Sequence, residues 1–217
     1  MADLEALVAP LRAHAAGTHA DPAHDLAHLA RVWENARKLA TEEGVPVDAT
    51  LAGAAWLHDL VALPKDDPRR SAASRLSAEA AAPILSDLGL APDQVEAARH
   101  AIEAHSFSAG IQPRTPLARV IQDADRLDAL GAVGLARCLT VGASLGRPLY
   151  DPDDPFARDR PLDDTRWTID HFATKLLTLP ASMQTATGRA LALDRTRPLR
   201  AFLADLAGEI GLPAPDW

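Results

Sequence analysis

Apolar residues recur at helical spacing along most of the chain, and no stretch of any length alternates apolar and polar residues like a half-buried strand. The clearest stripe follows Asp21-Pro22, an acid and a proline that favour a helix start, and continues until Gly44. Proline, glycine and aspartate separate the later stripes. We therefore predict an all-α chain, with further helices over about 47–60, 72–88, 92–105, 115–127, 129–143, 164–179 and 182–208. The segment 146–164, with four prolines, is predicted to be a long ordered loop or a lid.

Composition narrows the possible partners. The net charge is −8, from 22 Lys and Arg against 30 Asp and Glu, which argues against a nucleic-acid polymer but allows a small phosphorylated substrate held by a local cation cluster. No apolar run approaches the roughly 20 residues that span a bilayer, and the first residues lack the features of a signal peptide. With Cys138 as the single cysteine, we expect a cytoplasmic protein without a membrane partner. Nothing in the composition indicates an oligomeric state.

Four polar residues carry the candidate chemistry. His28, His58 and Asp125 fall on the inward, apolar stripes of three different helices, and Asp59 directly follows His58. A single inward histidine is more often a core residue than a ligand, and His-Asp is a common dipeptide. Burying an isolated carboxylate costs several kcal/mol, however, unless it is paired or bound to a cation. Two imidazoles and two carboxylates suit Mn, Fe, Co, Ni, Zn or Mg, so the set predicts a divalent metal site.

Five segments together carry a family resemblance across residues 21–187: DPAHDLAHLARVW, WLHDLVALPKDDPRRSAAS, AIEAHSFSAGIQPRTPLARVIQDADRLDALGAVGLAR, DPFARDRPLDD and IDHFATKLLTLPASMQT. The chain resembles the HD-domain metal-dependent phosphohydrolases, and most closely their YedJ/YpgQ-like bacterial branch. The resemblance implies one HD-type helical bundle over residues 1–217, with a metal-binding core at about 21–143 and a loop and C-terminal helical extension at about 144–217. It implies His28, His58, Asp59 and Asp125 as metal ligands, with Asp125 preferred because the family's last acid precedes Arg-Leu.

The resemblance also implies an activity. The branch suggests cleavage of a nucleoside triphosphate to a monophosphate and pyrophosphate by a metal-activated water, with Mn²⁺ favoured and Asp59 at the catalytic centre. The alternatives are a phosphodiesterase or phosphomonoesterase of the same fold, or a non-catalytic module that binds a metal or a nucleotide. Alarmone hydrolases and deoxynucleoside monophosphatases of the superfamily carry an acid three residues after His-Asp, where this chain has Ala62. We therefore do not expect those two activities.

Other histidines are candidates for substrate or metal contacts. His24 lies one helical turn before His28, so either both bind metal or His24 lies above the ion near a phosphate. We predict that it binds substrate near the site, and a surface histidine is the further alternative. His105 is the candidate general acid or phosphate contact, with a structural histidine as the alternative. His100 and His105 also lie in the region where two-metal members of the superfamily find extra ligands, but we expect one metal ion because a spacing of five residues does not define one helical face.

Cations near the predicted ligands suggest how phosphates are held. Lys65 and Arg69 follow the His-Asp pair in the loop 64–70, and we predict that both bind substrate and assist its hydrolysis. The alternative is that they are solvated charges beside Asp66 and Asp67.

Two further residues follow Asp125 on the same predicted helix. We predict that Arg126 binds substrate phosphate, unless it pairs with Asp123 or Asp128. Asp128, one turn after Asp125, is predicted to orient a metal ligand or to contact a sugar hydroxyl.

Overall fold

The computed structural model describes residues 2–16, 25–61, 63, 67, 69–106 and 109–217. Those residues form helices joined by turns, with no β-strand among them, so the all-α prediction is confirmed. The chain divides into two compact units, residues 1–125 with 184–188, and residues 126–183 with 189–217. The interpretation of 1–217 as a single domain stays a prediction.

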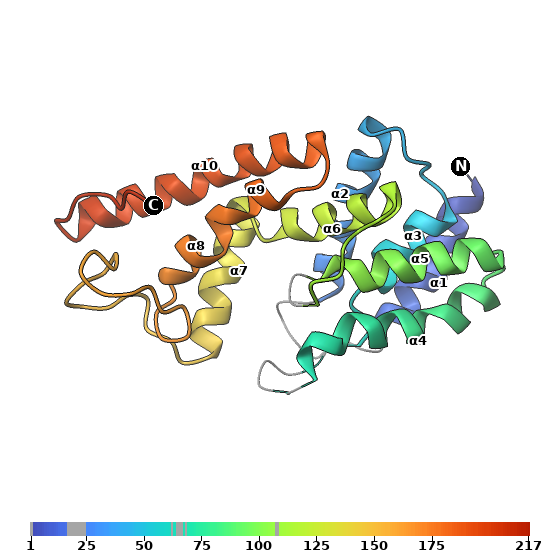
Figure 1. Ribbon diagram of the computed structural model, residues 1–217, viewed down its shortest axis with the longest axis horizontal. Coiled ribbons are helices and arrows are strands. Elements are labelled where there is room, and N and C mark those ends of the chain that lie inside the picture. The colour runs from blue at the N-terminus through green and yellow to red at the C-terminus, as the bar shows by residue number, and fades with distance from the viewer. Residues whose placement is uncertain (1, 17–24, 62, 64–66, 68, 107–108) are drawn as a thin grey trace. The chain divides into compact units, whose positions relative to one another are not determined.

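In the first unit, the central element is α3 (Ala49–Leu57), which is buried from Thr50 to Leu57. Its sequence, ATLAGAAWL, is apolar on all sides, as expected for a helix that is covered all round. At Gly53 an added Cβ would collide with Leu85, so glycine lets α4 approach closely. Around α3 pack α1 (Ala2–Ala16), α2 (Leu26–Glu42), α4 (Ala73–Asp87) and α5 (Pro92–His105), and the unit also holds most of α6 (Pro116–Asp128) (Figure 1).

Two predicted helix ends differ from the observed ones. The predicted start at Asp21-Pro22 lies outside the described residues, and α2 instead begins at Leu26, where the Asp25 side chain accepts a hydrogen bond from the backbone N–H of His28 at 2.9 Å. The predicted helix 47–60 ends early, at Leu57, so His58 and Asp59 occupy the turn that follows it. The helix over 92–105 matches α5, whereas α1 was not among the predicted helices.

In the second unit, α7 (Gly131–Ser144) precedes the proline-rich segment, and α10 (Ala186–Glu209) supplies residues from Arg189 onward. The predicted helix over 164–179 is wrong. The chain there forms α8 (Asp170–Thr174), a 3₁₀ turn (Leu176–Thr178) and α9 (Leu179–Ser182). A continuous helix is prevented because the backbone N–H groups of Thr168 and Ile169 donate to the carbonyl oxygens of Pro148 and Leu149 instead of to carbonyls one helical turn earlier. No single described helix is long and apolar enough to span a membrane, and only the bent pair α6 and α7 passes that test together.

The proline-rich segment is held by its own side chains. Asp154 accepts hydrogen bonds from three successive backbone N–H groups, those of residues 158–160. Arg160 then makes two hydrogen bonds, of 2.6 and 2.9 Å, to the fully buried carboxylate of Asp170. The backbone N–H of Asp163 donates to the same carboxylate at 2.7 Å. These bonds give the segment the ordered-loop character predicted from its sequence.

Candidate metal centre

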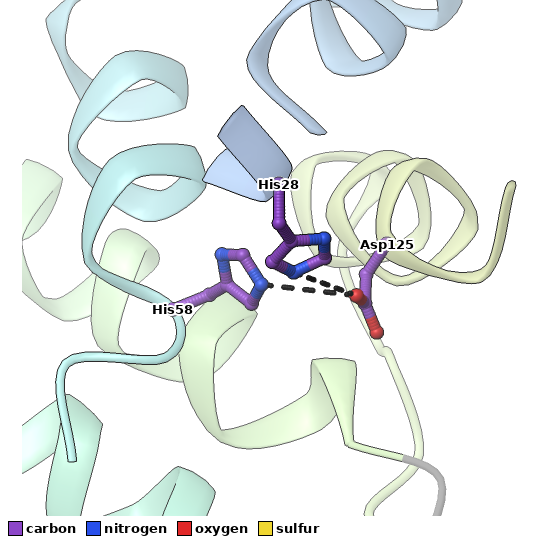
Figure 2. Close-up of side chains that lie close together, drawn as sticks. All are labelled: His28, His58 and Asp125. Carbon is purple, nitrogen blue, oxygen red and sulfur yellow. Dashed lines mark ion pairs between the residues drawn. The ribbon is translucent and has the colours of Figure 1, made fainter. Parts of the chain in front are cut away.

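Five side chains from four segments of the first unit converge in one place. Figure 2 shows three of them, His28 from α2, His58 from the turn after α3, and Asp125 from α6, turned toward one another. The Nε2 atom of His28 lies 3.6 Å from Asp125 Oδ1 and 3.8 Å from Asp59 Oδ2. The Nε2 atom of His58 lies 3.8 and 3.7 Å from the same two oxygens. The four side chains predicted as metal ligands therefore surround a common point.

The His58 ring shows that the cluster suits a cation. Its Nδ1 lies 2.8 Å from the carbonyl oxygen of Ala55, which places the ring proton on Nδ1 and leaves Nε2 as an acceptor. That Nε2 is buried and makes no hydrogen bond to any residue that the structure describes, although two carboxylates lie near it. A buried polar atom without a partner costs about 1–3 kcal/mol, and a divalent ion bound to Nε2 would remove that cost. The residues present therefore fit the metal that the sequence predicts.

His105, the last residue of α5, is oriented in the same way. Its Nδ1 lies 2.6 Å from the carbonyl oxygen of Ile102, three residues earlier, and its Nε2 lies 3.4 Å from Asp59 Oδ1. The ring also meets that of His58 edge-on, with 4.8 Å between centroids. His105 thus belongs to the same cluster and contacts Asp59.

The cluster has a closed side and an open side. The side chains of His28, His58 and His105 are 0–5% exposed, whereas those of Asp59 and Asp125 are 26% and 27% exposed. The imidazoles therefore form the floor, and a ligand from solvent would reach the cluster past the carboxylates.

Burial and neighbouring charges shift the pKa values of three side chains in the cluster. Burial, only partly opposed by the Asp59 carboxylate, lowers the pKa of His58 to about 4. Burial would raise the pKa of Asp125, but the imidazoles of His58, His105 and His28 outweigh it and lower that pKa below its ordinary value. Burial would likewise lower the pKa of His105, but Asp59 and Asp125 raise it. At neutral pH, His58 is therefore neutral and Asp125 is anionic, as metal binding requires.

Of the predicted substrate residues His24, Lys65 and Arg69, the structure describes only Arg69. His24 and Lys65 lie outside the described residues, so their roles stay predictions. Arg69 is exposed, and its guanidinium donates to the Asp67 carboxylate at 2.9 and 3.2 Å. The predicted alternative for Arg69, a surface charge beside an acid of its own loop, thus agrees with the observed contact.

Two residues predicted to bind substrate or orient a ligand contact other residues of the second unit. Arg126 donates to the backbone carbonyl of Ser182 at 2.7 Å. Asp128 is buried and accepts a hydrogen bond from Arg137.

His100 on α5 was a candidate ligand for a second metal ion. Its Nε2 atom accepts a hydrogen bond from the backbone N–H of Arg114 at 3.0 Å, so this nitrogen already has a partner without a metal ion.

The comparisons with known proteins identify the family of this chain. The family model of the HD domain matches residues 25–130. The chain is 30% identical over 191 residues to YpgQ of Bacillus subtilis strain 168, covering 86% of this chain and 84% of that protein. The chain belongs to the HD-domain family and is a metal-dependent phosphohydrolase of that superfamily.

Solved structures show the same fold. The crystal structure of B. subtilis YpgQ in complex with ADP is 28% identical, with a TM-score of 0.73, over 94% of this chain and 97% of that one. An HD-superfamily hydrolase from Bacillus thuringiensis is 28% identical, with a TM-score of 0.71, over 95% and 96% of the two chains. A Lactobacillus plantarum protein reaches 32% identity and a TM-score of 0.72 over 95% and 98%.

Proposed function

We propose that this phosphohydrolase cleaves nucleoside triphosphates to monophosphate and pyrophosphate, with Mn²⁺ as the preferred divalent ion. The observation that carries the proposal is the buried His58 Nε2 in a His/Asp cluster, which faces two carboxylates and has no hydrogen-bond partner in the described part of the chain. The ADP complex of YpgQ supports a nucleotide as the ligand, and the family resemblance favours Mn²⁺.

The four proposed ligands bind the ion from two sides of the cluster. His28 and His58 bind the ion through Nε2 on the closed side of the cluster, while Asp59 and Asp125 bind it on the side open to solvent. A divalent ion held there would activate water for attack on phosphorus and neutralise phosphate charge. The two anionic carboxylates also leave the centre with little net charge, so further cations are needed to hold a polyphosphate. Lys65 and Arg69 are our candidates.

His105 is proposed as the proton donor of the centre. Its Nδ1 is directed at the Ile102 carbonyl, so Nε2 is the nitrogen that would exchange a proton. That nitrogen faces Asp59 Oδ1, so the raised pKa of His105 and the position of Asp59 depend on each other. A His105→Gln variant should therefore lose activity and yet keep much of its metal.

Hydrolysis in ¹⁸O-labelled water tests the proposed bond cleavage. Attack on the α-phosphorus forms its new P–O bond from water and breaks the bond to the β-phosphate bridging oxygen, so the label enters the monophosphate and pyrophosphate leaves unlabelled. Label in the pyrophosphate, or release of orthophosphate, would contradict the proposal. Cyclic nucleotides, monophosphates and bis(p-nitrophenyl) phosphate, each assayed with Mn²⁺, Mg²⁺, Co²⁺, Ni²⁺ and Zn²⁺, would reveal a phosphodiesterase or phosphomonoesterase. Binding of a nucleotide without any turnover would indicate a regulatory module.

A further inference from the structure

The part of α6 directly before Asp125 is tied to two other helices of the first unit by buried side chains. Gln122 Nε2 donates to the carbonyl oxygen of Ala104 at 2.6 Å. Asn35 Nδ2 donates to the carbonyl oxygen of Ala124 at 3.1 Å. Gln122 is 3% exposed and Asn35 is 9% exposed, so water competes little with either bond. Rotation or sliding of α6 would break both.

Each tie leads to a helix that carries an imidazole of the cluster. Asn35 lies seven residues, or about two helical turns, after His28 on α2, so both side chains lie on one face. Ala104 directly precedes His105 at the end of α5, where the last carbonyl groups lack partners within the helix. The two bonds therefore connect the backbone beside Asp125 to the backbone that holds His28 and His105.

We propose that Asn35 and Gln122 are positioning residues that set the separation between Asp125 and the imidazoles, and thereby the affinity of the centre for its ion. This inference rests on the proposed metal centre. Metal ligands must be held to within about 0.5 Å, and groups that orient them commonly change metal affinity by about 10- to 100-fold. Sequence analysis missed both residues. The only signal in the sequence is a polar amide at helical spacing from a predicted ligand, since Asn35 lies seven residues after His28 and Gln122 three residues before Asp125.

A third tie on the same helix provides the control. The Asp123 carboxylate accepts hydrogen bonds from the backbone N–H of Thr185 at 2.8 Å and from its hydroxyl at 2.7 Å. It also accepts the backbone N–H of Gln184. The segment 184–188 carries none of the five clustered side chains, so this tie stabilises α6 without joining it to an imidazole.

The experiment compares Asn35→Leu and Gln122→Met, which remove each amide at nearly constant size, with Thr185→Val. Mn²⁺ affinity is measured on the full chain by electron paramagnetic resonance of the free ion, and unfolding midpoints are measured without metal. We expect all three variants to unfold earlier, but only Asn35→Leu and Gln122→Met to bind Mn²⁺ at least tenfold more weakly. If Asn35→Leu does not fold, Asn35→Ser replaces it.

Three results would overturn the inference. The first is an Mn²⁺ affinity within twofold of wild type in both the Asn35 and the Gln122 variant. The second is an equal loss of affinity in Thr185→Val, which would mean that any loosening of α6 has the same effect. The third is a wild-type chain that binds no Mn²⁺, and this result alone also overturns the metal centre and the proposed function.

Discussion

Asp123 and Asp125 lie two positions apart on α6, and their carboxylates serve different parts of the first unit. Asp123 is fully buried and accepts hydrogen bonds from Thr185, whereas Asp125 Oδ1 lies 3.6 Å from the Nε2 atom of His28. Two residues correspond to about 200° around a helix, which directs the two side chains to opposite sides. The geometry therefore supports the choice of Asp125 over Asp123 as a ligand.

Removing one proposed ligand should remove the metal. Asp59→Ala and Asp125→Ala each take away an oxygen within 3.8 Å of both imidazole nitrogens, so we expect the purified variants to contain little or no metal by elemental analysis. Asp123→Asn is the matched control on α6, and it should unfold earlier while it retains metal. A full metal complement in Asp59→Ala would refute the ligand assignment.

Removing the metal should leave the helices largely intact. The first unit has an extensive apolar core around α3, and a chain of 217 residues buries roughly 70% of its unfolded surface without any ion. Far-ultraviolet circular dichroism before and after chelation should therefore change little at 25 °C. Loss of most of the helical signal would show instead that folding depends on the ion, as in a zinc finger.

Loss of a cation from the loop 64–70 should weaken hydrolysis of a triphosphate. Lys65→Ala and Arg69→Ala each remove a proposed charge-assisted phosphate contact, so we expect kcat/KM to fall about 10- to 100-fold. We expect the smaller effect for Arg69, because it already pairs with Asp67. Metal content should not change.

The comparison substrate for these two variants is a phosphodiester with a neutral leaving group, which offers no phosphate tail. An equally large loss of activity on that substrate would show that Lys65 and Arg69 do not bind the phosphate tail of a triphosphate. Unchanged activity on both substrates would show that Lys65 and Arg69 are surface charges.

Breaking the buried ion pair of the second unit should cost stability. Asp170 is fully buried and accepts two hydrogen bonds from Arg160, so Arg160→Met leaves a buried carboxylate without its charged partner. Such losses typically cost about 3–5 kcal/mol, and the unfolding midpoint in urea should fall accordingly. Arg197→Met is the control, because Arg197 and Asp194 form a pair that is 76% and 65% exposed and should contribute less than about 1 kcal/mol. Equal midpoints for the two variants would contradict this interpretation.

Helical periodicity by itself determined the all-α class and most helices, and α5 spans the predicted residues 92–105. It also predicted the direction of His28 and Asp125, because the direction of a side chain on a helix follows from local spacing, whereas His58 lies in the turn directly after α3. The family resemblance, in which the last acid precedes Arg-Leu, then favoured Asp125 over Asp123 as the ligand. These features depend on short stretches of chain, which is why they can be predicted from the sequence.

Only the tertiary structure decided which inward groups meet. The amide of Asn35 bonds to a carbonyl 89 residues away, and the region predicted as one helix over 164–179 is broken by hydrogen bonds to Pro148 and Leu149. Such contacts depend on how distant segments pack. Tertiary hydrogen bonds to a distant carbonyl can override the local helix propensity of a segment. Periodicity can show that a polar residue faces inward, but its partner exists only after the helices have packed.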